Sequence, residues 1–112
     1  MKRKSISTLI IILAVIVIAV WAINRPIPQT TEEIAECIGQ NGVLYVQLGC
    51  HACNLQEDYF GEYHVLLNKV DCIFNKQACI DKNISATPTW EIDGTFYSGA
   101  KSIEKLKDLT GC

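Results

Sequence analysis

Two cysteines separated by a dipeptide, Cys50-His51-Ala52-Cys53, follow closely on a short apolar run at residues 43–48. The run is rich in β-branched and apolar residues, which predicts a buried strand. A CxxC pair that leaves a strand and begins a helix places its first sulfur beside the unpaired N–H groups and the positive dipole end of that helix, which favour a thiolate. The thiolate is the attacking form in thiol–disulfide exchange. The spacing therefore predicts an exchange site in which Cys50 and Cys53 react and His51 and Ala52 shape the surroundings.

The same cysteines have two other interpretations. Cys50, His51 and Cys53, with Cys72 and Cys79, offer the ligands of a zinc or copper carrier. Because Cys50 and His51 are neighbours that point different ways, and because no second CxxC occurs, we expect no metal, and thiol–disulfide exchange requires no organic cofactor. The other alternative is a non-catalytic exported binding domain on a disulfide scaffold. Within the exchange interpretation, the partial positive charge of His51 stabilises the thiolate of Cys50; the alternative for His51 is a plain exposed turn residue.

The six cysteines of the chain favour disulfides in an oxidising compartment. Six cysteines allow fifteen pairings. Local spacing makes Cys50 and Cys53 the redox pair and Cys72 and Cys79 the next nearest neighbours. A bridge across the loop of about eight residues between Cys72 and Cys79 contributes ~2.5 kcal/mol on the chain-entropy estimate. We therefore predict a structural staple there, with a second relay pair as the alternative.

The elements that must position these residues follow from periodicity and turn signals. Thr30, with Glu33 three residues later, is typical of a capping box at a helix start. Asp93-Gly94 is a two-residue hairpin signal. The order α-β-α-β-α-β-β-α is expected from a helix at 30–38, a strand at 43–48, a helix at 50–60 with Leu55, Tyr59 and Phe60 on its inner side, a strand at 66–72, a helix at 76–82, a hairpin at 89–97 and a helix at 102–109.

Residues 6–23 are eighteen consecutive uncharged and mostly apolar positions. As a helix rising about 1.5 Å per residue they span roughly 27 Å, close to the hydrocarbon thickness of a bilayer. Basic residues at positions 2–4 precede the span, so the positive-inside rule predicts a cytoplasmic tip at 1–5 and an exported domain. The sequence thus predicts a single-pass protein of the cell membrane. A signal peptide cleaved after Ala22 is the alternative.

Beyond this span the composition changes. Residues 24–29, with Pro26 and Pro28, are expected to form a short stiff linker to a domain at 30–112. Residues 25–112 carry seven basic and twelve acidic side chains, a net charge of −5. No basic patch with interleaved aromatic residues occurs, which argues against nucleic acid as a partner.

Together these residues resemble the thioredoxin family. A strand leads into a CxxC at a helix start, and Thr87-Pro88-Thr89 follows more than thirty residues later, just before the hairpin. In that family the proline is cis and faces the CxxC, and X–Pro is the peptide bond that adopts cis at low cost. The resemblance implies an α/β thioredoxin-like fold, a central mixed sheet flanked by helices, in which Thr87 and Pro88 shape the site.

A narrower resemblance covers residues 31–112. It is to the thioredoxin-like domains found with, or fused to, vitamin K epoxide reductase homologues, and segments 66–72, 85–94, 97–99 and 102–106 carry it together with Cys79. It implies protein thiols and disulfides as substrates and a membrane quinone-linked oxidase, on another chain, as redox partner. In the family fold the ends of the first and last helices lie at one pole, on opposite faces of the sheet, where Cys37 and Cys112 could pair.

Departures from the family pattern bear on the redox direction. Gly49 stands where the family usually has an aromatic residue, and Leu44 replaces its buried acid. His51 occupies the first dipeptide position, whereas disulfide-forming members more often carry a histidine in the second. Without the buried carboxylate, proton uptake that aids Cys53 in reductive cycles lacks its usual relay. We therefore predict a membrane-anchored, extracytoplasmic thiol–disulfide oxidoreductase, with the direction left open.

Overall fold

The computed structural model describes residues 2–25 and 27–112; Pro26, in the expected linker, lies outside the described residues. The order of elements expected for the domain is confirmed, with one further short 3-10 helix, η1, that the sequence did not predict. The elements are α1 (Lys2–Ile23), α2 (Glu32–Asn41), β1 (Gly42–Val46), α3 (His51–Phe60), η1 (Gly61–Leu66), β2 (Asn68–Asp71), α4 (Lys76–Asp81), β3 (Thr89–Ile92), β4 (Thr95–Ser98) and α5 (Ile103–Thr110).

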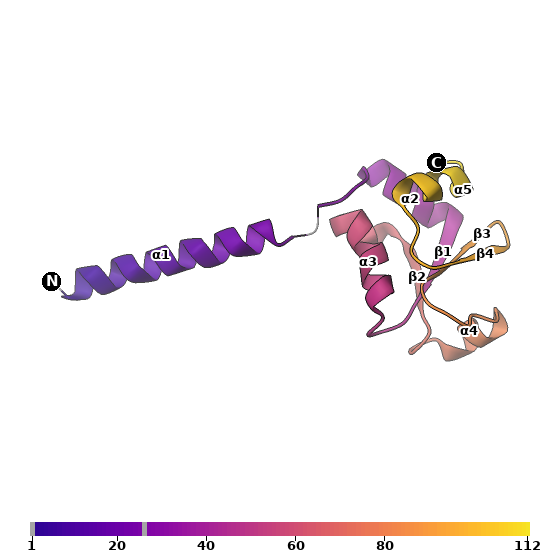
Figure 1. Ribbon diagram of the computed structural model, residues 1–112, viewed down its shortest axis with the longest axis horizontal. Coiled ribbons are helices and arrows are strands. Elements are labelled where there is room, and N and C mark those ends of the chain that lie inside the picture. Colours follow the sequence, from indigo (N-terminus) through magenta and orange to yellow (C-terminus); the bar gives the residue numbers. More distant parts are fainter. Residues whose placement is uncertain (1, 26) are drawn as a thin grey trace.

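Helix α1 projects away from the rest of the chain (Figure 1). None of its residues is buried against the domain, and it is long and apolar enough to cross a membrane. It includes the whole of the predicted span at 6–23, and it begins earlier because Lys2, Arg3 and Lys4 continue the helix.

The four strands form one mixed sheet in the order β2-β1-β3-β4. Strands β1 and β2 are parallel, whereas β1–β3 and β3–β4 are antiparallel. Asp93 and Gly94 join β3 to β4 with φ values of 51° and 75°, and positive φ at both central residues is what a type I′ hairpin turn requires. With α3 following β1 and α4 linking β2 to β3, this arrangement confirms the predicted thioredoxin-like fold.

The apolar core lies on one face of the sheet. Leu44 and Trp90 pair across β1 and β3, so their side chains point to the same side. Both are fully buried, and Val46 and Ile92 extend the same face along the two strands. The side chains that pack on this face come from α2, α3, α5 and the segment after η1: Ala35, Ile38, Cys53, Phe60, Leu67, Ile103 and Leu106.

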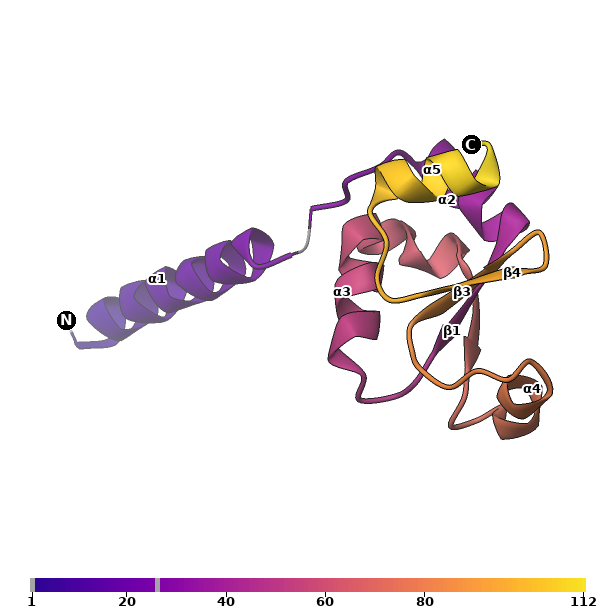
Figure 2. The ribbon, with the colours of Figure 1, turned by 45° about the vertical axis from the view of Figure 1, so that its right-hand side comes forward.

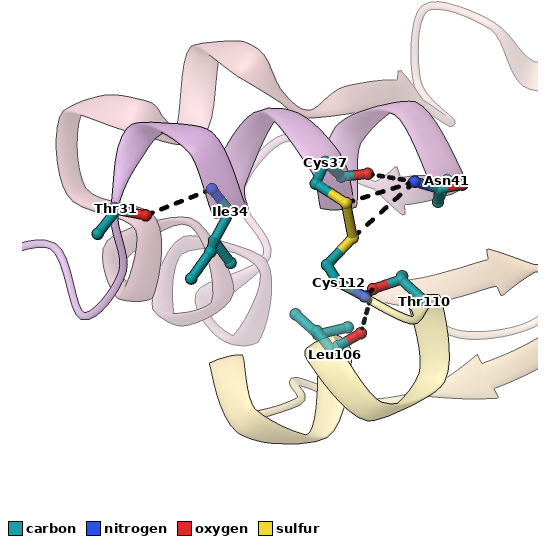
Figure 3. The surroundings of a disulfide bond; sticks show 7 residues. All are labelled: Thr31, Ile34, Cys37, Asn41, Leu106, Thr110 and Cys112. Carbon is teal, nitrogen blue, oxygen red and sulfur yellow. Dashed lines mark hydrogen bonds between the residues drawn. A yellow bond between two sulfur atoms is a disulfide. The ribbon is translucent and has the colours of Figure 1, made fainter.

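Helices α2 and α5 pack against one another over this face (Figure 2). Cys37 of α2 and Cys112, two residues beyond α5, are joined in a disulfide with a Cα–Cα distance of 6.0 Å (Figure 3). Asn41 Nδ2 donates to the carbonyl of Cys37 at 2.7 Å. The expectation that these two helices lie on opposite faces of the sheet is wrong, because Ile38 and Leu106 belong to the same core.

The start of α2 also differs from the prediction. Thr31, and not Thr30, is the N-cap, and its side-chain oxygen accepts a hydrogen bond from the N–H of Ile34. The predicted cap is displaced by one residue because the first helical residue is Glu32.

The opposite face of the sheet carries a polar cluster. Tyr45 donates from its hydroxyl to Glu91 at 2.7 Å, and the ammonium of Lys82 lies 3.2 Å from the other carboxylate oxygen. Burial, and then the hydrogen bond to Glu91, raises the pKa of Tyr45 to about 12. The hydrogen bond from Tyr45, with help from Lys82, lowers the pKa of Glu91 against the opposing effect of burial. The segment that follows α4 therefore covers part of this face.

The linker reaches the domain at the C-terminal end of α3. The N–H of Gln29 donates to the carbonyl of Tyr59 at 2.8 Å. Pro28 lies so close to Gly61 that a Cβ there would meet the proline ring at 2.9 Å. The ten residues of α3 rise about 15 Å, so the linker and the CxxC lie at opposite ends of this helix (Figure 1).

Candidate active site

The CxxC begins α3, as the sequence predicted. Cys50 is the N-cap residue, and its sulfur accepts a hydrogen bond from the N–H of Cys53 at 3.1 Å. The two cysteines form a disulfide with a Cα–Cα distance of 5.2 Å. Cys53 is only 2% exposed, whereas Cys50 is half-buried. Cys50 is therefore the more accessible cysteine of the pair.

Thr87 and Pro88 lie beside Cys50. The peptide bond between them is cis, and the Cys50 sulfur is 3.6 Å from the carbonyl oxygen of Thr87. Pro88 is fully buried and Thr87 is half-buried. The carbonyl of Pro88 accepts a hydrogen bond from the N–H of Gly99 at 2.8 Å, so the loop after β4 is hydrogen-bonded to this segment.

The other residues expected at the site are exposed. His51 and Ala52 form the first turn of α3 and point to solvent. Gly49 precedes the site with a φ of 83° and has open space where a Cβ would be. That positive φ explains why glycine stands here rather than an aromatic residue.

Cys72 and Cys79 are joined in a disulfide with a Cα–Cα distance of 5.6 Å. The N–H of Cys72 donates to the carbonyl of Val46 at 2.8 Å, which places Cys72 at the end of the parallel strands where the CxxC loop also begins. Cys79 is buried and Cys72 is half-buried. The bridge closes the loop between β2 and α4 next to the site.

The inner side of α3 differs from the prediction. Leu55 is 43% exposed, whereas Gln56 is fully buried together with Cys53 and Phe60. These three residues stand at positions i, i+3 and i+7, which place them on one helical face. We did not identify Gln56 from the sequence, because a glutamine is seldom fully buried. The i, i+3, i+7 spacing was the available signal.

The chemistry open to this arrangement is that of the two sulfurs. Across residues 2–25 and 27–112, no group of three or more His, Cys, Asp or Glu side chains is arranged to hold a metal ion. A disulfide with one accessible and one buried sulfur, at a helix N-terminus, can be opened by an incoming thiolate at the accessible sulfur.

Solved structures that are similar to this chain include two proteins. No family model matches the chain. Among solved structures, it is similar to the N-terminal domain of the alkylhydroperoxide reductase AhpF from Enterococcus faecalis, with 20% identity and a TM-score of 0.49. That match covers 71% of this chain and 44% of the other, so this chain spans less than half its length. It is also similar to oxidised thioredoxin from Plasmodium falciparum, with 20% identity, a TM-score of 0.42 and coverage of 74% and 91%.

Proposed function

We propose that this protein is a membrane-anchored thiol–disulfide oxidoreductase that acts through Cys50 and Cys53. The observation that carries the proposal is the asymmetry of the pair: Cys53 is 2% exposed, whereas Cys50 is accessible at the N-cap of α3. Helix N-termini favour a thiolate, and the accessible sulfur of a CxxC is the one that exchanges. The imidazole of His51 is exposed next to Cys50, and an imidazolium beside a cysteine favours its thiolate.

In the oxidising direction, a substrate thiolate attacks the sulfur of Cys50 and the Cys50–Cys53 bond breaks. Cys53 leaves as a thiolate, which takes up a proton, and a mixed disulfide joins Cys50 to the substrate. A second substrate thiolate then attacks the substrate sulfur and releases Cys50. The substrate loses two electrons and the CxxC gains them. In the reducing direction the Cys50 thiolate attacks a substrate disulfide, and Cys53 resolves the intermediate.

Thr87 and Pro88 are proposed to align an extended substrate beside Cys50. Their support is the 3.6 Å separation between the Cys50 sulfur and the Thr87 carbonyl. Ala52 leaves the first turn of α3 uncrowded. The bridges Cys72–Cys79 and Cys37–Cys112 are proposed to be structural.

We further propose that a membrane oxidase similar to vitamin K epoxide reductase reoxidises the CxxC. The sequence resemblance supports this partner. The linker meets the domain at the end of α3 opposite the CxxC, and only residues 24–27 separate α1 from the docked Pro28. Four residues reach at most about 14 Å. We therefore propose that the partner carries its own cysteines above the bilayer surface on an extramembrane loop.

Single cysteine variants test the exchange function. Cys53→Ser leaves Cys50 able to attack a substrate disulfide but unable to release it, so mixed disulfides should accumulate as reducible bands on a non-reducing gel. Cys50→Ser should trap nothing and lose exchange activity. Cys79→Ala is the matched control, because it also leaves one unpaired thiol, Cys72, without touching the CxxC. If Cys79→Ala traps as much as Cys53→Ser, or if both CxxC variants keep wild-type activity, the proposal fails.

Metal analysis of the purified protein tests the exchange function against the metal carrier that the cysteine pattern also allowed. A tightly held stoichiometric metal, with the Cys50 and Cys53 thiols free, would favour the carrier. A reducible Cys50–Cys53 bond without metal supports exchange.

A further inference from the structure

A buried glutamine, Gln56, connects the CxxC helix to strand β3 and to the loop between β4 and α5. Its side chain is fully buried. The indole N–H of Trp90 donates to its Oε1 at 3.0 Å, and the backbone N–H of Lys101 donates to the same oxygen at 2.6 Å. Its Nε2 donates to the carbonyl of Lys101 at 3.0 Å. Burying an amide is costly unless it is hydrogen-bonded, and here both ends of the amide have partners.

Both residues that Gln56 contacts, Trp90 and Lys101, are connected to Pro88. Trp90 lies two residues after Pro88 on β3, and Lys101 lies in the loop whose Gly99 donates its N–H to the Pro88 carbonyl. Gln56 itself lies one helical turn beyond Cys53. Gln56 therefore connects the CxxC helix, through β3 and the loop after β4, to the Thr87-Pro88 segment. The carbonyl oxygen of Thr87 in that segment lies 3.6 Å from the Cys50 sulfur.

We propose that Gln56 is a positioning residue that holds the Thr87-Pro88 segment at its distance from Cys50, and that this position matters for polypeptide substrates but not for small thiols. The proposal rests on the exchange function proposed above. An extended polypeptide must lie along Thr87 and Pro88 while its sulfur meets Cys50, so a shift of the segment misaligns it. A small thiol needs only the sulfur of Cys50, whose helix N-terminus does not depend on Gln56.

The test compares two rates at which the oxidised full-length protein is attacked, one by reduced glutathione and one by a reduced, unfolded ribonuclease. Gln56→Leu keeps the size of the side chain and removes all three hydrogen bonds. We expect its rate with ribonuclease to fall about tenfold, since a misplacement of about 1 Å can cost up to about a hundredfold, and its rate with glutathione to change less than about twofold. Trp90→Phe removes one donor and should shift the same ratio by about threefold.

Tyr45→Phe is the matched control. It removes one hydrogen bond from a buried side chain on the opposite face of the sheet, so it lowers stability without a contact to Gln56, and both of its rates should stay at wild-type values. If Gln56→Leu lowers both rates equally or lowers neither, the proposal is overturned. Should Gln56→Leu fail to fold, an unchanged ratio in Trp90→Phe overturns it. A wild-type protein that reacts with neither thiol refutes the exchange function itself, and the proposal with it.

Discussion

Removal of the Cys37–Cys112 bridge should destabilise the domain more than removal of the Cys72–Cys79 bridge. The first pair is separated by 75 residues and the second by 7. On the chain-entropy estimate, the bridge that closes the longer loop stabilises the folded state by about 4.5 kcal/mol, and the bridge that closes the shorter loop by about 2.5 kcal/mol. Small domains have free energies of unfolding of roughly 5–10 kcal/mol. The Cys37→Ala/Cys112→Ala variant should therefore lose most of its stability.

Urea unfolding followed by tryptophan fluorescence measures this difference. A Trp21→Phe background leaves the fully buried Trp90 as the reporter. With a denaturant slope of about 1–2 kcal/mol per M, the Cys37/Cys112 variant should unfold at a urea midpoint roughly 1–2 M below that of Cys72→Ala/Cys79→Ala. The single variant Asn41→Ala keeps the bridge and removes only the hydrogen bonds that the Asn41 amide donates to Cys37 and Cys112, and it serves as the control. Equal midpoints for the two double variants, or a lower one for the Cys72/Cys79 variant, would refute the loop-closure reasoning.

Four further predictions concern the second disulfide, the pH dependence of stability, the topology and the length of the linker. The Cys72→Ala/Cys79→Ala variant should keep most of its exchange activity in the folded fraction, and loss of activity at unchanged stability would make this pair a relay. The free energy of unfolding should fall as pH rises from about 10 to about 12, because the pKa of Tyr45 is raised to about 12 in the folded protein, so this tyrosine ionises at lower pH in the unfolded chain. Tyr45→Phe should remove this part of the pH dependence, on the order of 2 kcal/mol, as measured by urea midpoints. Protease added outside spheroplasts should digest the domain, and a protected domain would contradict the proposed topology. Twelve Gly/Ser residues inserted before Pro28 should speed exchange with a lipid-linked thiol and leave exchange with soluble proteins unchanged. An unchanged rate with the lipid-linked thiol would contradict the limit that the short linker is proposed to set on the reach of the CxxC.

The reactive pair and the elements around it could be predicted because their signals are local. An apolar β-branched run, a helix start at a CxxC and an Asp93-Gly94 turn each fit within a few residues of sequence. The structure places β1, α3 and the hairpin at those positions. The same locality explains why Cys72 and Cys79 could be paired from spacing alone.

The face of α3 could not be predicted because distant residues decide it. Leu55 is the more apolar residue, yet it is exposed, and the amide of Gln56 is buried because its partners lie 34 and 45 residues further along the chain. Hydropathy gives a glutamine a low tendency to be buried, and only the fold brings Trp90 and the backbone of Lys101 to it. Burial of a polar side chain therefore depends on contacts that no local pattern contains.

The arrangement of α2 and α5 follows the same logic on a larger scale. The family resemblance placed the two helices on opposite faces of the sheet, but both direct apolar side chains into one core. The Cys37–Cys112 bridge then joins two elements that already pack together, at the end of the domain away from the CxxC. A staple at that position stabilises the domain while α3 remains free to present Cys50. Stability and exchange chemistry thereby depend on different disulfides, which is why we expect reduction of Cys50–Cys53 during exchange to leave the fold intact.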